Sequence, residues 1–158
     1  MSFLRSLQDS AFTDWFLGSD SVWTYPTFLM LHTVGLAILV GASLVIHLRI
    51  LNVGAAISLA RLRPLYGFVW IGFLINLVTG LVLFVTQAAD RAVDPVFYVK
   101  MGSVAVALWL GFVVRRRAFD STRDAAPARG AIKALAAVAL LLWATAIVSG
   151  RLIAYLSG

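Results

Sequence analysis

The hydrophobic and polar positions of this chain fall into long blocks. Four long apolar runs are separated by short connections that are rich in charged residues, proline and glycine. Each run is long enough to cross the hydrocarbon core of a bilayer, which takes about 20 residues of helix. We therefore predict an all-α fold, an integral membrane four-helix up-down bundle with spans at about 26–50, 65–88, 96–115 and 132–156.

The beginning of the chain has a different pattern, in which apolar and aromatic side chains are interrupted by acidic ones. The interrupting residues are Asp9, Asp14 and Asp20. We expect no cleavable signal peptide here, because no apolar run is continuous. We predict an interfacial amphipathic helix over residues 1–24, with Trp15, Trp23 and Tyr25 at headgroup level, before a transmembrane domain over residues 25–158.

Composition agrees with this pattern. Hydrophobic residues make up 61% of the chain and charged residues 13%, about half the charged fraction that soluble domains carry. The chain contains no cysteine, which excludes disulfides, thiolate nucleophiles and cysteine-bound clusters. The four spans use nearly the whole length, so we expect no separate catalytic domain.

The net charge of +6 reports orientation and does not indicate nucleic acid. Nine basic residues lie in or beside the first and third connections: Arg49, Arg61, Arg63, Arg115, Arg116, Arg117, Arg123, Arg129 and Lys133. The other four are Arg5, Arg91, Lys100 and Arg151. The positive-inside rule makes the larger group cytoplasmic, so we expect a bacterial inner-membrane protein with both termini outward.

Both histidines of the chain, His32 and His47, lie in the first predicted span. An α-helix rises about 1.5 Å per residue, so the two rings lie roughly 22 Å apart, near opposite membrane faces. They fall on one side of the helix, together with Leu39, Ser43 and Ile46. One chain therefore cannot bind a single ion with both rings.

Small residues recur one turn apart in two other spans, a pattern that lets membrane helices approach closely. In the second span they form the set Gly72, Asn76 and Gly80, in which the amide of Asn76 needs a partner. In the third they are Ser103, Ala107 and Gly111, on the side that carries Lys100. We expect Lys100 to face protein and not lipid.

Three polar side chains from three different spans lie at similar depth below the outer boundary. They are His32, Lys100 and Arg151, each roughly 7–9 Å deep, and Tyr155 lies one turn beyond Arg151. Two cations at this depth are costly unless they snorkel or meet an anion. In an up-down bundle the three spans can share one interior, so we expect a common anionic ligand.

Haem b fits that expectation. His32 would be an axial ligand, and the two cations would bind the propionates. The second axial ligand would be Met101, Met30 or the His32 of a second copy in a homodimer. Two copies of His47 would make a second, inner site for haem or metal.

The same residues have plainer interpretations. Lys100 and Arg151 can snorkel to headgroups, and His32 can make an interhelical hydrogen bond. His47 can be an interfacial residue, and Met30 and Met101 can be core filler. Copper bound by His32 with a methionine also stays open. No paired carboxylates, nucleophile triad or phosphate-binding loop is present to indicate a stand-alone enzyme.

Five segments together resemble a known family: LHTVGLAILVG (31–41), HLRIL (47–51), TGLVLF (79–84), DPVFYVKM (94–101) and WATAIVSGRLIAYL (143–156). They are similar to small four-helix bacterial membrane proteins of unknown function. More distantly the layout resembles the copper-resistance D and membrane cytochrome b bundles. The resemblance implies the architecture and draws attention to His32, Lys100 and Arg151. At the position of His47 the family more usually has an acidic residue, so this chain departs there.

We therefore expect a membrane-embedded, haem b-binding electron-transfer protein that passes electrons between the quinone pool and an outer-face partner. Its expected partners are membrane lipid, quinone and a second copy or a larger membrane complex. Two alternatives are a cofactor-free accessory subunit of such a complex and a small transporter or metal carrier.

Overall fold

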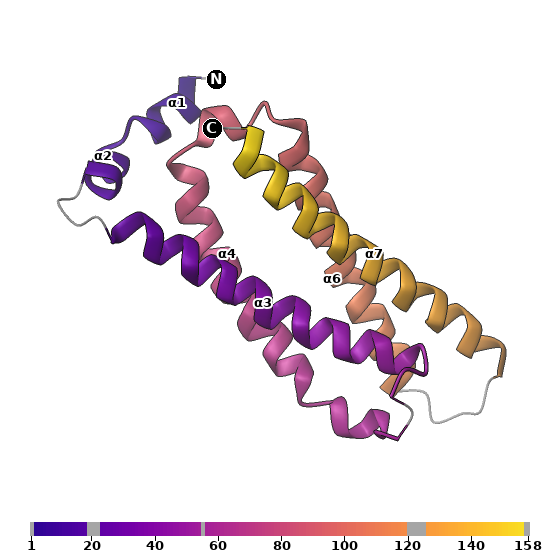
Figure 1. Cartoon of the computed structure of the whole chain (residues 1–158). Coiled ribbons are helices and arrows are strands. Elements are labelled where there is room, and N and C mark those ends of the chain that lie inside the picture. The colour runs from indigo at the N-terminus through magenta and orange to yellow at the C-terminus, as the bar shows by residue number, and fades with distance from the viewer. Residues whose placement is uncertain (1, 19–22, 55, 120–125, 157–158) are drawn as a thin grey trace. The chain divides into compact units, whose positions relative to one another are not determined.

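The structure is a computed structural model that describes residues 2–18, 23–54, 56–119 and 126–156. Every element among these residues is helical (Figure 1). In chain order the elements are α1 (Ser2–Gln8), α2 (Ala11–Gly18), α3 (Thr24–Ile50), the 3-10 helix η1 (Leu59–Leu62), α4 (Leu65–Val85), α5 (Ala88–Arg91), α6 (Pro95–Phe119) and α7 (Ala126–Leu156). The all-α prediction is confirmed.

Four helices are long and apolar enough to cross a membrane. They cover Thr24–Ile50, Leu59–Val85, Pro95–Arg117 and Gly130–Tyr155. These ranges match the four predicted spans to within a few residues at most ends, so the predicted class of membrane protein is confirmed.

Three helix ends differ by three residues or more from the predicted boundaries, and one of them is the end of α6, which continues to Phe119 beyond the predicted residue 115. α4 ends at Val85, short of the predicted residue 88, because the chain turns at Thr86 and Gln87 before α5 begins. α7 begins at Ala126, six residues before the predicted start of the span at about 132, with Pro127 in its first turn. Proline is tolerated in the first turn of a helix, where its missing N–H has no intrahelical partner anyway. Residues 120–125, in the third connection, lie outside the described residues.

The end of α3 is set by a left-handed cap. Asn52 has a φ of 73°, which lies in the left-handed α region that asparagine adopts more readily than most other non-glycine residues. The Val53 N–H donates to the Leu48 carbonyl at 2.9 Å, and the Asn52 N–H donates to the Arg49 carbonyl at 3.1 Å. This pair of bonds is the Schellman arrangement, which satisfies the last carbonyls of a helix.

The chain divides into two compact units, and each is described by itself. Unit 1 consists of Met1–Leu39 and Gly67–Asp94, and unit 2 of Val40–Tyr66 and Pro95–Gly158. α3 runs through both, so unit 1 holds its first part with His32 and unit 2 its last part with His47.

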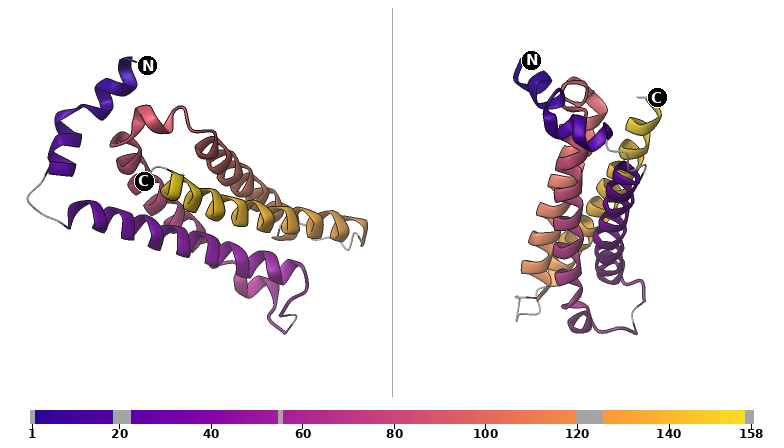
Figure 2. Two further views of the ribbon diagram at one scale, coloured as in Figure 1. Left: turned by 45° about the horizontal axis from the view of Figure 1, so that its top comes forward. Right: turned by 90° about the vertical axis from the view of Figure 1, so that its left-hand side faces the viewer.

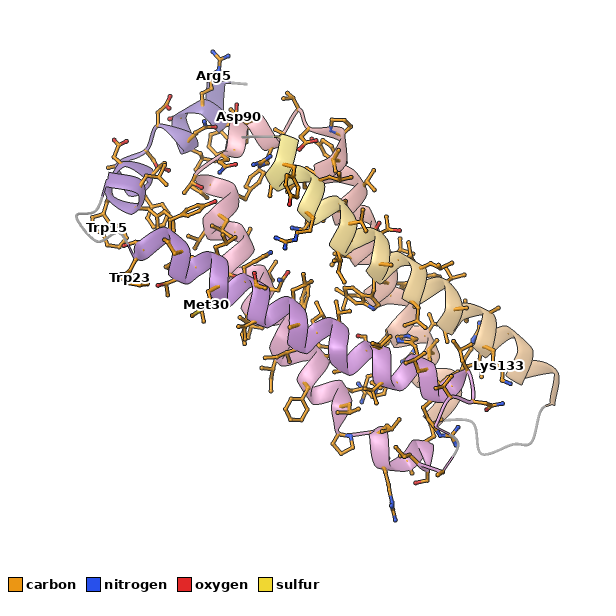
Figure 3. The ribbon with its side chains drawn as sticks, viewed as in Figure 1. Arg5, Trp15, Trp23, Met30, Asp90 and Lys133 are labelled. Atoms are coloured by element: carbon orange, nitrogen blue, oxygen red, sulfur yellow. The ribbon has the colours of Figure 1, made fainter. Side chains whose placement is uncertain are left out.

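In unit 1 the N-terminal segment forms two short helices where one was predicted. The Gln8 side chain joins α1 to α5, since its Nε2 donates to Asp90 Oδ2 at 3.2 Å and its Oε1 accepts from the Ala89 N–H at 2.9 Å. Phe16 of α2 is 1% exposed and packs edge-on against Phe28 of α3, with 5.2 Å between the ring centroids. Trp15 and Trp23 are both exposed and project outward in Figure 3, as aromatic side chains at a membrane interface do.

Also in unit 1, α3 and α4 cross at van der Waals distance. A Cβ placed on Gly72 would lie 2.5 Å from the Leu39 nitrogen and 2.8 Å from the Gly35 oxygen. A Cβ on Gly35 would lie 2.9 Å from the Asn76 nitrogen. Only glycine fits these positions, because the obstructing atoms are backbone. The small-residue face predicted on α4 therefore packs against α3.

In unit 2, α6 and α7 lie side by side and run in opposite directions (Figures 1 and 2). Their buried faces carry mainly small side chains: Ser103 and Ala107 on α6, and Ala136, Ala139, Ala146 and Ser149 on α7. Leu110 and Val114 continue the face of α6, and Gly111 lies half-buried at its edge. The predicted stripe thus faces protein at its first two positions.

The crossing of α3 and α4 generates a stability prediction. Gly72→Ala forces the two backbones apart and should lower the free energy of unfolding by about 1–3 kcal/mol, because no side-chain rotation relieves the overlap. Gly67→Ala on the same helix is the matched control, since nothing lies within 4 Å of its added methyl group. It should be neutral or raise stability by about 0.5–1 kcal/mol. Thermal unfolding of both variants in detergent measures this, and equal melting temperatures would refute the crossing.

Candidate functional site

His32 lies half-buried on α3 and packs against α4. Its Nδ1 is 3.0 Å from Thr79 Oγ1, and its Cε1 is 3.0 Å from the position that a Cβ would take on Gly80. Its backbone oxygen accepts a hydrogen bond from Asn76 Nδ2 at 2.9 Å. One face of α4 thus holds His32 both through its imidazole ring and through its main-chain oxygen.

The hydrogen bonds of Thr79 favour one of the two tautomers of the His32 ring. The Thr79 hydroxyl has one hydrogen, which it donates to the Ile75 carbonyl at 2.7 Å. Toward His32 its oxygen therefore acts as the acceptor, so the His32 Nδ1 is the protonated nitrogen. In a neutral ring this leaves the lone pair on Nε2.

His47, on the same helix but in unit 2, is more deeply buried. It is 3% exposed, and its Nδ1 is 2.6 Å from the backbone oxygen of Ser43, one turn earlier. A carbonyl only accepts, so Nδ1 carries the proton here too. The Nε2 of His47 is buried and has no hydrogen-bond partner among the described residues. The two histidines share one tautomer in different surroundings.

Lys100 lies across α7 within unit 2. Its Nζ is 3.7 Å, and its Cε 3.6 Å, from the position that a Cβ would take on Gly150. The side chain is half-buried, and the next residue of α7 is Arg151, which is exposed. The structure therefore brings Lys100 to the level of Arg151, while His32 belongs to unit 1.

The remaining sequence-predicted site residues are exposed. Met101 is 42% exposed and Met30 is 58% exposed, and Figure 3 shows Met30 projecting from α3. Met101 lies two residues before the buried Ser103 and so on nearly the opposite side of α6. Tyr155 is 80% exposed, one turn beyond Arg151. The exposure of both methionines does not favour either as an axial ligand from within the chain.

Thr79 is the site residue that sequence reasoning missed. It is 5% exposed and is the direct partner of the His32 ring. A signal was present, because Thr79 lies three residues after Asn76 and so on nearly the same face of α4. A threonine within an apolar run is common, however, and nothing in the spacing pairs it with His32. Among the described residues no group of three or more His, Cys, Asp or Glu side chains is placed to hold a metal ion.

Comparison with known protein families identifies the family to which the chain belongs. Residues 9–156 match the family described as "Family of unknown function (DUF6644)", and the chain belongs to that family. No curated protein and no solved structure matches it.

The tautomer assignment can be tested by side-chain ¹⁵N NMR of histidine-labelled protein. We expect both histidines to show a protonated Nδ1 and an unprotonated Nε2. Thr79→Val keeps the shape of the side chain but removes the acceptor, so it should release His32 into a mixture of tautomers and leave His47 unchanged as the internal reference. An unaltered His32 spectrum in that variant would show that Thr79 does not hold the ring.

Proposed function

We propose that this member of the family binds haem b within the membrane through His32 and carries electrons between the quinone pool and a partner on the outer face. We further propose that it lies in the bacterial inner membrane with both termini outward. The single observation that supports the haem assignment is the hydrogen bond from His32 Nδ1 to Thr79.

The His32 ring has the donor set that an axial ligand needs. Histidines that bind iron generally donate the other ring N–H to a fixed acceptor, which selects the tautomer and raises the basicity of the ligating nitrogen. Thr79 supplies that acceptor, and the absence of a side chain at Gly80 leaves room for the ring against α4. The haem would supply a one-electron change at iron, which no side chain of this chain can provide.

From the sequence alone we propose Lys100 and Arg151, both in unit 2, as the partners of the two propionates. An ammonium and a guanidinium near one end of α6 and α7 complement two carboxylates near the membrane boundary. Arg151 is exposed, and Lys100 crosses to Gly150 on the same helix. These residues would orient the ligand and compensate its charge.

The second axial position is proposed for the His32 of a second copy. Within one chain the available sulfur ligands, Met101 and Met30, lie on exposed sides of their helices. A homodimer that shares a haem would supply two equivalent imidazoles, each held by its own Thr79.

The alternative of a cofactor-free accessory subunit is supported by the same contacts. The bonds from His32 to Thr79 and from Asn76 to His32 can join two membrane helices without any ligand. This alternative predicts a colourless protein that co-purifies with other subunits in mild detergent.

Replacing the proposed ligand is the direct test by mutation. His32→Leu should lower the haem bound per chain by roughly tenfold or more, because it removes the ligating nitrogen. Thr33→Val is the matched control, since the Thr33 hydroxyl bonds only within α3, to the Leu29 carbonyl. Haem per chain is measured by pyridine haemochrome after purification. Equal haem per chain in the His32→Leu and Thr33→Val variants would show that His32 does not bind the haem.

Replacing the proposed propionate partner should have a smaller and different effect. Arg151→Gln should weaken haem binding by about fivefold, as expected for an exposed ion pair, and keep the axial ligation. It should also lower the midpoint potential, because losing a nearby positive charge favours Fe³⁺. Lys133→Gln, at the other end of α7, is the control. A potentiometric titration in which the two variants behave alike would contradict this role for Arg151.

A further inference from the structure

The guanidinium of Arg115 is held over an aromatic ring within unit 2. Its Cζ lies 5.3 Å from the centroid of the Tyr66 ring, which is within the range of a cation–π contact. Tyr66 is 9% exposed and so forms a fixed support, whereas the Arg115 side chain is exposed. An aromatic ring orients a guanidinium but does not neutralise its charge. The contact joins the first turn of α4 to the end of α6.

A second arginine lies one turn before Tyr66. The Arg63 carbonyl accepts the Tyr66 N–H at 3.3 Å, and the Arg63 side chain is exposed. Leu62, the last residue of η1, is 8% exposed and anchors this turn. Tyr66 therefore brings the basic segment before α4 and the basic end of α6 to the same part of unit 2.

Acidic side chains that could neutralise these arginines are scarce in unit 2. Residues 40–66 and 95–158, which form the unit, contain no glutamate, and their only aspartates are Asp120 and Asp124. Both aspartates lie outside the described residues. The first and third connections carry nine basic residues by comparison. An anion from outside the chain is therefore expected at Arg115.

The positions of Tyr66 and Arg115 along their helices indicate the class of anion. Tyr66 is in the first turn of α4, and Arg115 is about one turn before the end of α6 at Phe119. Both helices are long and apolar enough to cross a membrane, so these ends lie near the lipid headgroups, where phosphate is the prevailing anion. A guanidinium can bind a phosphate through two parallel hydrogen bonds.

We propose that Arg115, oriented by Tyr66 and assisted by Arg63, binds the phosphate of an anionic phospholipid at this end of unit 2. The site does not depend on the proposed haem. A zwitterionic lipid has the same phosphate but also a cationic group, which the two arginines repel. The first bound phosphatidylglycerol should therefore bind about fivefold or more tightly than the first phosphatidylcholine, the effect of one or two basic residues.

Native mass spectrometry of the full chain in detergent measures the dissociation constant of the first bound molecule of each lipid. Arg115→Gln should weaken phosphatidylglycerol binding by about fivefold and leave phosphatidylcholine binding nearly unchanged. Arg116→Gln is the matched control, because it removes the same charge from the next residue. The Cζ of Arg116 lies 4.9 Å from the ring centroid of Phe112, which is 46% exposed, and not over Tyr66. This control should stay within about twofold of the wild type.

A second pair of variants tests the role of the ring. Tyr66→Leu removes the support of Arg115 and should weaken phosphatidylglycerol binding by about two- to fivefold, the size of an exposed cation–π contact. Tyr66→Phe keeps the aromatic face and should bind as the wild type does. Circular dichroism and thermal unfolding establish that each variant is folded.

Three results would overturn the inference. Equal affinity of the wild type for the two lipids would show that no anionic headgroup is recognised. Equal losses in folded Arg115→Gln and Arg116→Gln variants would show a diffuse basic surface without a site at Tyr66. Displacement of phosphatidylglycerol by millimolar inorganic phosphate, but not by the same concentration of chloride, would assign the site to free phosphate.

Discussion

The close approach of α3 and α4 is the constraint on which the candidate site depends. Membrane helices gain no hydrophobic energy by leaving lipid for one another, so they associate through tight packing and polar contacts. Gly35 and Gly72 bring the two backbones into contact, and the Asn76 amide bonds to the main chain of His32. This contact sets both the separation and the register of the helices. The ring of His32 consequently reaches Thr79, and the order of donors along that chain of bonds leaves the lone pair on Nε2, the nitrogen that we propose as the haem ligand.

The two histidines show how one type of side chain is held in two different surroundings. Both carry the proton on Nδ1, but the acceptor for His32 is a side chain of another helix, whereas the acceptor for His47 is a carbonyl of its own helix. His32 is half-buried and His47 is fully buried, so the two rings differ in how closely a ligand could approach them.

Much of this architecture could be predicted from the sequence, because a span is set by the length of an apolar run and by bilayer thickness. The less certain ends were those set by local geometry. α5 depends on a turn at the end of α4, and α7 begins six residues before its predicted start, with Pro127 in its first turn. The face of α4 that carries Gly72 was also predictable, because the helical repeat determines which residues of one helix share a face. Its partner helix was not, because spacing within one helix does not say which neighbour it meets. Thr79 was missed for the same reason.

The central claim is that the imidazole of His32 is held ready to bind haem iron. The most direct test is the reduced-minus-oxidised absorption spectrum of the unaltered protein, purified after expression with ample haem. The account predicts a Soret band and a sharp α band, as for a low-spin b-type haem with two axial ligands. A featureless spectrum from folded protein prepared in this way would contradict it.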